Sequence, residues 1–165
     1  MVKEDKKNNE NKKSRVKIIS RAIQYLKENN ILTMATASID GKPRADALEY
    51  ASDDLETFVL SPEKSWKVSN IKNNPQIFYE VHHVLDIDIE KLKGIIGLQV
   101  EALPEIISFN DSRFTKYFKM MQDKYPLFKK MKKLDDRVIL LFRPKKLWLL
   151  DYKKRFFHRD AVFFD

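Results

Sequence analysis

The feature of this sequence that most limits its fold is a series of short strand-like segments that follow one another through tight turns. Asp40-Gly41 is a strong signal for a tight hairpin between two of these segments. The predicted strands cover residues 31–38, 44–50, 55–60, 76–84, 94–103, 138–142 and 147–152. Pro104 is expected to end the fifth strand, and Pro144 to separate the last two. Strands in hairpin order with few helices predict a mainly β (α+β) fold, an antiparallel barrel of six or seven strands with peripheral helices.

Three segments have helical spacing instead. Apolar residues recur at this spacing from Ser14 to Asn29, a second short helix follows Ser65 and ends before Pro75, and a third covers residues 111–125. Residues 1–13 consist almost wholly of Lys, Asn, Glu and Asp, which cannot bury enough apolar area to offset the entropy of ordering. We therefore expect a disordered tail over residues 1–13 and a single domain over residues 14–165.

Composition excludes several kinds of site. The chain has no cysteine, which excludes disulfides, thiolate nucleophiles and cysteine-ligated zinc or iron–sulfur centres. Its three glycines are too few for a Walker or Rossmann phosphate loop, so a phosphate site would need side chains and a helix N-terminus. The sequence has no apolar run that could span a membrane, and its first residues do not resemble a signal peptide. We expect a cytoplasmic protein without membrane association.

The net charge of +8 is concentrated in one part of the sequence. Residues 116–155 contain 14 basic and 4 acidic side chains, whereas the remainder is slightly acidic. Such a block is compatible with nucleic-acid or membrane-surface binding, or with a solvated lysine-rich surface. Lysine dominates the block and its aromatic residues do not form a stacking platform, which favours the solvated surface. A nucleic-acid-binding barrel stays as an alternative hypothesis.

The most informative segment for chemistry is LSPEKSWKVSNIKNNP, residues 60–75. Ser65 is the expected N-cap of the second helix, and Lys67 follows two residues later. The free N–H groups and the dipole of a helix N-terminus attract anions, and Lys67 adds a full positive charge. Ser61, at the end of the preceding strand, adds a hydroxyl from the opposite wall. This combination suits a phosphomonoester, although Ser65 could equally serve only as a cap with Lys67 solvated.

The order of these features resembles the pyridoxamine 5′-phosphate oxidase-like family of FMN-binding split barrels. Members begin with a helix and a strand that ends near an Asp-Gly hairpin, here ATASIDGKPRADALEY, followed by a Thr-x-x-x-Ser-Arg-Lys segment and a helix that closes at Asn-Pro. This chain has Ser61 at the threonine position, then Ser65, Trp66 and Lys67. The resemblance extends over about residues 15–152 and implies a split barrel with peripheral helices.

The resemblance also implies a cofactor site. Ser61, Ser65 and Lys67 would hold the FMN phosphate, whereas Trp66 in place of arginine removes one phosphate donor. The strand 44–50 would lie along the isoalloxazine and contact it mainly through backbone groups, with Arg44 as a charged contact. The predicted site therefore also includes Leu48, Glu49 and Tyr50. In this family two subunits pack barrel to barrel and share the cofactor. Trp148 would then reach the partner's flavin or be buried in its own sheet.

A flavin site needs few catalytic side chains, so the sequence names no catalytic residue. We expect an FMN-dependent oxidoreductase that acts on an unidentified small substrate. The alternative is a barrel that binds or stores a flavin, deazaflavin or heme without turnover. Near the C-terminus, Arg155, His158 and Arg159 could contact an anionic substrate, with His158 as a proton donor. They could also belong to a basic tail that packs through its phenylalanines onto the partner subunit.

No metal site is expected. His82 and His83 are adjacent on a predicted strand, so their side chains point to opposite faces and cannot clamp one ion. Asp86, Asp88 and Glu90 alternate in a polar segment, but this segment lacks the glycine and the length of a calcium-binding loop.

Overall fold

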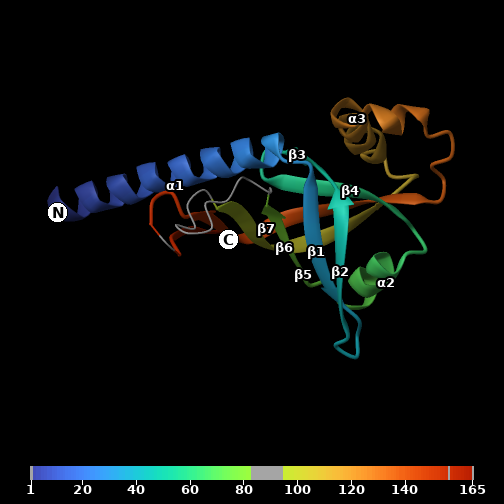
Figure 1. Ribbon diagram of the computed structural model, residues 1–165, viewed down its shortest axis with the longest axis horizontal. Coiled ribbons are helices and arrows are strands. Elements are labelled where there is room, and N and C mark those ends of the chain that lie inside the picture. Colours follow the sequence, from blue (N-terminus) through green and yellow to red (C-terminus); the bar gives the residue numbers. More distant parts are fainter. Residues whose placement is uncertain (1, 83–94, 156, 165) are drawn as a thin grey trace.

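The computed structural model describes residues 2–82, 95–155 and 157–164. These residues form a single antiparallel sheet of eight strands, three α-helices and one 3-10 helix (Figure 1). The strands are β1 (Ile31–Ala37), β2 (Pro43–Glu49), β3 (Ala51–Asp53), β4 (Glu56–Pro62), β5 (Ile77–His82), β6 (Ile96–Ser108), β7 (Arg137–Asp151) and β8 (Arg159–Phe163). The helices are α1 (Val2–Glu28), α2 (Trp66–Asn73), α3 (Phe114–Lys124) and the 3-10 helix η1 (Pro126–Lys130).

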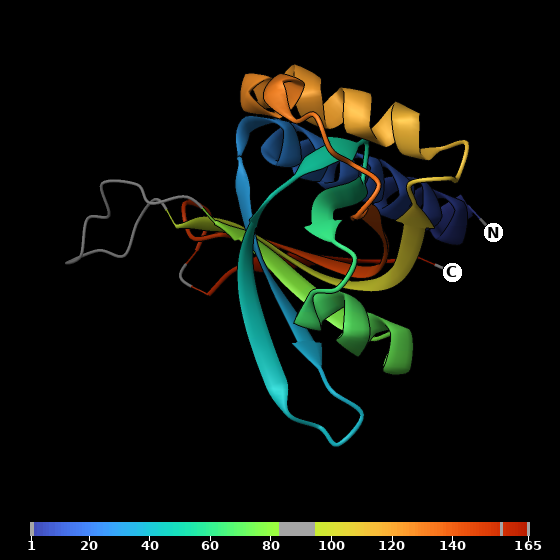
Figure 2. The same cartoon turned by 90° about the vertical axis from the view of Figure 1, so that its right-hand side faces the viewer.

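The sheet curls into a split barrel, as the sequence predicted. Its strand order is β2-β1-β5-β6-β7-β4-β3, with β8 added beside β7, and β2 comes into contact with β4. Figures 1 and 2 show α1 and α3 along the top of the curled sheet and α2 lower down, beside β2. Besides the three-residue β3, the strand that the sequence did not predict is β8. Of its five residues only Val162 is buried, so its hydrophobic pattern is too weak to mark a strand.

The predicted hairpin joins β1 and β2. The Ser38 N–H donates to the Lys42 carbonyl at 3.0 Å, and the Gly41 N–H donates to the Ser38 carbonyl at 2.9 Å. Gly41 has a φ of +83°, a value that costs glycine little and side-chain-bearing residues more. This turn sets the register in which the inner-face residues of β2 lie opposite the buried residues of β1.

Two predicted strand breaks are wrong, because both prolines lie inside continuous strands. β5 pairs with β6 only as far as Ala102. At Pro104 the one described neighbour of β6 is therefore β7, and a residue without an N–H is tolerated because no strand pairs with its other edge. Pro144 lies inside β7 beside a bulge, where Lys145 is the extra residue between the pairs made by Lys146 and Pro144. The bulge accommodates a residue that cannot donate a ladder hydrogen bond.

The first helix also differs from the prediction. It begins at Val2 rather than at Ser14, and Figure 1 shows its N-terminal half extending beyond the sheet. Residues 2–13 were expected to be disordered because they have little to bury. Lysine and glutamate are nevertheless good helix formers, and adding a residue to an existing helix costs less than nucleating one. The second half of the helix packs on the barrel through the buried residues Ala22, Tyr25 and Leu26.

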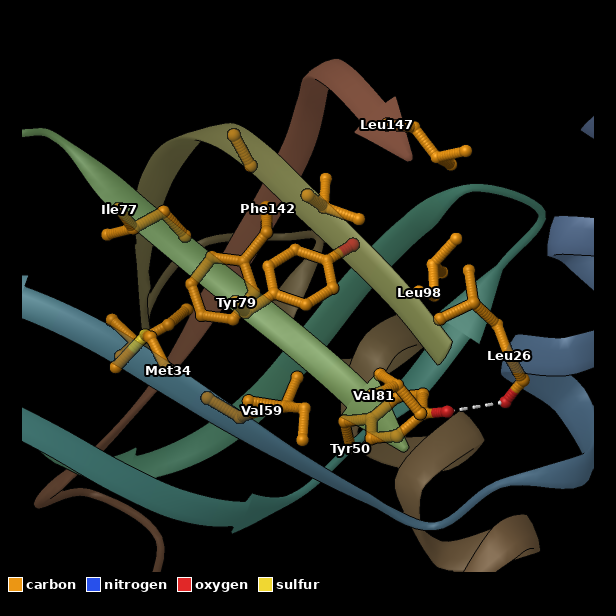
Figure 3. Close-up of a cluster of buried hydrophobic side chains, with 14 of the residues drawn as sticks. Leu26, Met34, Tyr50, Val59, Ile77, Tyr79, Val81, Leu98, Phe142 and Leu147 are labelled. Carbon is orange, nitrogen blue, oxygen red and sulfur yellow. Dashed lines mark hydrogen bonds between the residues drawn. The ribbon is translucent and has the colours of Figure 1, made fainter. Parts of the chain in front are cut away.

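Two hydrophobic clusters hold the fold together. The larger fills the barrel and contains buried residues from α1, α2 and most strands, among them Leu26, Met34, Tyr50, Val59, Tyr79, Leu98 and Phe142 (Figure 3). The smaller lies on the outer face, where α3 packs on β4, β6 and β7 through Phe114, Tyr117, Phe118 and Met121. Both faces of β4 are therefore covered, which fixes the position of its last residues next to α2.

The residues weighed as metal ligands fall mostly outside this description. His83, Asp86, Asp88 and Glu90 lie outside the described residues, whereas His82 ends β5. The His82 ring is exposed and its Nδ1 lies 2.7 Å from Glu80 Oε1. Among the described residues, there is no group of three or more His, Asp or Glu side chains placed to hold a metal ion.

Candidate functional site

One end of the barrel brings together the last residues of β4 and the first turn of α2. Along β4, Thr57, Val59 and Ser61 share the inner face, and Ser61 is only 2% exposed. Ser65 occupies the N-cap position of α2, as the sequence predicted, but its side chain makes no capping hydrogen bond. Its Oγ instead lies 3.0 Å from Ser61 Oγ. The two predicted phosphate-binding hydroxyls are therefore neighbours at a helix N-terminus.

Lys67 extends from the first turn of α2 to the inner face of β2. Its Nζ lies 3.4 Å from Oδ1 of Asp46, and the two side chains are 13% and 12% exposed. Arg44 Nε donates to the other carboxylate oxygen, Oδ2, at 3.2 Å. Asp46 thus lies between the two cations that the sequence assigned to the site, and the group carries a net charge of +1.

Asp46 was not among the residues predicted for the site, although the strand pattern contains a signal for it. Side chains alternate along a strand, so Asp46 shares the inner face of β2 with Arg44 and Leu48. The register places Asp46 opposite the buried Met34 and Arg44 opposite the buried Thr36. Asp46 therefore points from the inner face of β2 toward α2, which covers this end of the barrel and supplies Lys67 as its partner.

Two asparagines hold α2 against β1 and so fix where Lys67 begins. Asn70, which is buried, donates from Nδ2 to Thr36 Oγ1 at 3.0 Å. Asn74, the C-cap residue, donates from Nδ2 to the Ala37 carbonyl at 3.4 Å. These side chains position the helix relative to β1 and β2 without occupying its N-terminus.

A cavity of about 430 Å³ opens beside this group, between the β1–β2 hairpin and α2. Trp66 forms part of its wall and is 72% exposed, so it presents its indole to solvent. The full lining is Ser38, Ile39, Lys42, Pro43, Arg44, Trp66, Ser69, Asn70 and Asn73. The cavity therefore combines an apolar wall with two cations, Lys42 and Arg44.

The remaining β2 residues divide between the site and the core. Leu48 packs against the barrel core from the inner face, and Glu49 is exposed on the outer face. Tyr50 is completely buried, and its hydroxyl donates to the Leu26 carbonyl at 2.9 Å. The Tyr50 carbonyl accepts a 2.7 Å hydrogen bond from the Tyr125 hydroxyl, and burial raises the pKa of the Tyr50 phenol. Because its polar groups are already bonded within the fold, Tyr50 belongs to the core.

The structure does not bring Trp148 or the C-terminal group to this end of the barrel. Trp148 lies on the outer face of β7, with its ring 6.0 Å from the ring of Phe78. Arg159 lies over the same indole, with its Cζ 6.0 Å from the ring centroid. Figure 1 shows the β7–β8 turn at the opposite end of the molecule from α2. Within one chain these residues form a separate group.

Arg155 and His158 belong to that turn. Arg155 is exposed, and its carbonyl accepts a hydrogen bond from the His158 N–H at 2.9 Å. The His158 ring is partly buried, and its Nε2 lies 3.2 Å from Asp160 Oδ1. Asp160 also accepts a 2.7 Å bond from Lys154, and the charged neighbours lower the pKa of its carboxyl against the effect of burial.

The basic block of residues 116–155 is distributed rather than gathered. Several of its cations pair with acids from other elements: Lys116 with Asp53 at 2.8 Å, Arg143 with Glu56 at 2.9 Å, and Lys146 with Glu101 at 3.2 Å. Lys124 is turned inward onto the C-terminus of α1. This distribution favours the interpretation as a solvated, partly neutralised surface over a nucleic-acid footprint. None of the described helices is long and apolar enough to cross a membrane.

A family model matches most of the chain. The family model described as pyridoxamine 5′-phosphate oxidase matches residues 19–151, which include every element from the middle of α1 to the end of β7. Among curated proteins, none matches the chain.

Solved structures with a similar fold include a heme storage protein, a reductase and a stress protein. The heme storage protein HutZ of Vibrio cholerae is 16% identical, covers 79% of this chain and 94% of its own, and has a TM-score of 0.67. An F420 reductase is 29% identical, with coverage of 75% and 93% and a TM-score of 0.57. General Stress Protein 26 of Bacillus anthracis is 16% identical, with coverage of 87% and 97% and a TM-score of 0.62.

Proposed function

The chain belongs to the pyridoxamine 5′-phosphate oxidase family, and on this premise we propose that it binds FMN at the α2 end of the barrel and carries out redox chemistry on a small substrate. The observation that carries the proposal is the donor set at the N-terminus of α2. Two serine hydroxyls lie 3.0 Å apart there, and Lys67 extends from the first turn of the same helix. Hydroxyls, helix N–H groups and an ammonium are the donors that a phosphate needs when no glycine loop is present.

Each residue has a distinct part in this proposal. Ser61 and Ser65 donate hydroxyl protons to phosphate oxygens, and Lys67 neutralises part of the phosphate charge. Because β2 pairs with β1 alone in the described sheet, its other edge offers backbone N–H and C=O groups to the polar edge of a flavin ring. When bound, FMN supplies hydride and electron transfer, so the protein contributes binding, orientation and electrostatics.

We further propose that the protein is a cytoplasmic homodimer that packs through the outer face of the sheet. This face carries exposed Ala35, Ala45 and Ala47 beside Phe78 and the partly buried Trp148. Small and aromatic side chains on an exposed sheet surface favour close packing against a second copy. Such packing would let the Trp148 and Arg159 group of one subunit approach the α2 end of the other.

A second function, storage or transport of a planar ligand such as heme, is favoured by the cavity beside α2. Ile39, Pro43 and Trp66 give it an apolar wall, and Lys42 and Arg44 can meet acidic side groups at its rim. None of the described residues that line this cavity is a histidine, so an axial iron ligand would have to come from elsewhere. The fold likeness to a heme storage protein at 16% identity adds only the shared architecture.

The absorption spectrum of freshly purified protein, followed by chromatography of the material released by heat, separates the two functions. Flavin bands and release of FMN in near-equal ratio to chain are the expected result. A Soret band would favour heme. Protein that is colourless and does not bind added FMN contradicts the proposed cofactor. Oxidation of a reduced nicotinamide in the presence of FMN would then distinguish turnover from storage.

A further inference from the structure

We propose that Asp46 sets the specificity of the α2 end by competing with the ligand's phosphate for Lys67, which lowers the affinity for phosphorylated ligands. This inference rests on the proposed FMN site and concerns a residue that the site chemistry alone does not require. The observation is the ion pair itself: Asp46 holds Lys67 through Oδ1 and Arg44 through Oδ2.

The burial of Lys67 and Asp46 strengthens their electrostatic attraction. Lys67 and Asp46 are 13% and 12% exposed, so water screens their attraction less than it would at the surface. Arg44, by contrast, is 48% exposed and adds a weaker attraction from the rim. Lys67 therefore already has a counter-ion at short distance before any phosphate approaches.

A phosphomonoester near Lys67 would face this carboxylate. At neutral pH such a group carries a charge of about −1.5 to −2, so it attracts Lys67 but is repelled by Asp46. The two anions compete for one ammonium, since the hydroxyls of Ser61 and Ser65 carry no charge. To bind, the phosphate must draw Lys67 away from Asp46 or accept the repulsion, and either cost lowers affinity for phosphorylated ligands specifically.

Two further features support the competition. The first turn of α2 is Trp66-Lys67-Val68-Ser69, so it carries Lys67 as its single cation and no second one that would outweigh the carboxylate. The nearest further cations of the cavity, Lys42 and Arg44, line its outer part beside the β1–β2 hairpin. Arg44, the other cation on Asp46, is 48% exposed, so Lys67 is the more buried of the two and the one for which Asp46 and a phosphate would compete.

The test compares Asp46→Asn with wild type, using FMN and riboflavin as ligands that differ only in the phosphate. Asp46→Asn keeps the shape of the side chain but removes its charge, so we expect FMN to bind about tenfold more tightly and riboflavin to bind as in wild type. The matched control is Asp53→Asn, which also removes one negative charge but on β3, where Asp53 pairs with the exposed Lys116. This control is expected to leave both affinities unchanged.

Two results would overturn the inference while leaving the FMN site in place. One is unchanged FMN affinity in Asp46→Asn, and the other is equal tightening of FMN and riboflavin. Because loss of the pair leaves Lys67 without its anion, thermal unfolding of Asp46→Asn is measured first, and Asp46→Ser serves as the second variant if the first is unfolded.

Failure of the FMN site itself gives a different pattern. If neither flavin binds wild type or either variant, the proposed function is contradicted, and inorganic phosphate is then the probe. Shifts of the Lys67 side-chain NMR signals on addition of millimolar phosphate to Asp46→Asn, but not to wild type, would still support competition by Asp46. Identical responses of the two proteins would overturn it.

Discussion

The two ends of the barrel use their polar side chains in different ways. At the α1 end, hydroxyl and ammonium groups bond to the backbone of other elements. Tyr50 donates to the Leu26 carbonyl at 2.9 Å, Tyr125 to the Asn30 carbonyl at 2.6 Å, and Lys124 to the Asn29 carbonyl at 2.6 Å. At the α2 end, the side chains assigned to the phosphate site bond mainly to other side chains, in the Ser61–Ser65 contact and the Lys67–Asp46 pair, although Ser61 also donates to the Pro62 carbonyl at 3.3 Å.

This difference separates stability from binding. Tyr50 and Tyr125 join the end of α1 and the residues after it to β2 and α3, so losing one of these bonds loosens the contact between elements. A pair of side chains can separate by rotation, which leaves the backbone in place and frees donors for a ligand. The α1 end should therefore respond to mutation through unfolding, and the α2 end through affinity.

The largest effect is expected from Tyr50→Ala at the α1 end. It removes a fully buried ring from the barrel core together with its bond to α1, which should lower the free energy of unfolding by about 3–5 kcal/mol. Tyr50→Phe, which loses only the hydroxyl, should lose about 0.5–1.5 kcal/mol. Urea denaturation followed by tryptophan fluorescence measures the free energy of unfolding of both variants. Equal decreases in the two variants would show that the buried ring of Tyr50 does not contribute to stability.

At the α2 end, Lys67→Ala should affect binding more than folding. The loss of a charged hydrogen bond of about 1.5–3 kcal/mol predicts an FMN affinity lowered about 10- to 100-fold in a fluorescence titration. Lys116→Ala is the control, because it removes the same charge from an exposed ion pair on α3. Wild-type affinity in Lys67→Ala would show that this lysine does not hold the phosphate.

Stability should also depend on pH through a buried lysine at the α1 end. Burial lowers the pKa of Lys124 from 10.5 to about 8, whereas burial raises the pKa of Tyr125 from 10.0 to about 12. Below pH 8, Lys124 is charged in both the folded and the unfolded chain, so the cost of burying the charge is fully present. Between pH 8 and about 10 only the folded chain has released this proton, so stability should rise.

The comparison with Lys124→Met isolates this effect. The free energy of unfolding of wild type should rise relative to that of Lys124→Met between pH 8 and about 10, the range below the titration of tyrosines in the unfolded chain. Parallel pH profiles of the two proteins would mean that Lys124 titrates normally in the fold.

The smallest effect concerns Ser65. Because its side chain makes no capping bond, Ser65→Ala should cost less stability than the loss of an N-cap, which is typically about 1 kcal/mol. It removes one neutral donor from the proposed phosphate site, so FMN affinity should fall about 2- to 10-fold. A loss of stability as large as that of a cap, without a change in affinity, would instead favour the interpretation of Ser65 as a helix-capping residue.

Much of the fold was predictable because its signals are local. Asp40-Gly41 marks the hairpin, and Ser65 with Pro75 marks the two ends of α2, since turns and caps depend on a few neighbouring residues. Pro104 and Pro144 misled the strand assignments for the same reason. A proline excludes a ladder hydrogen bond only where a partner strand needs one, and the partners are set by the topology.

The candidate site was predictable in part. The segment from Ser61 to Lys67 is contiguous and follows a recognisable pattern, so its residues could be named from the sequence. The partner of Lys67 could not, because Asp46 lies on a different strand and meets Lys67 only once the sheet has curled and α2 has packed over its end. The sequence also could not show that the ring of Tyr50, which directly follows β2, fills the core.

The most direct test of a phosphate site at the α2 end is calorimetric titration of wild-type protein with FMN and, separately, with riboflavin. The two ligands differ only in the phosphate, so the difference in their binding free energies isolates the contribution of Ser61, Ser65 and Lys67. Tighter binding of FMN in the wild type, with the difference reduced about 10- to 100-fold in Lys67→Ala, is the expected result. Equal affinities of the wild type for the two ligands, or no binding of either, would contradict a phosphate site at this end of the barrel.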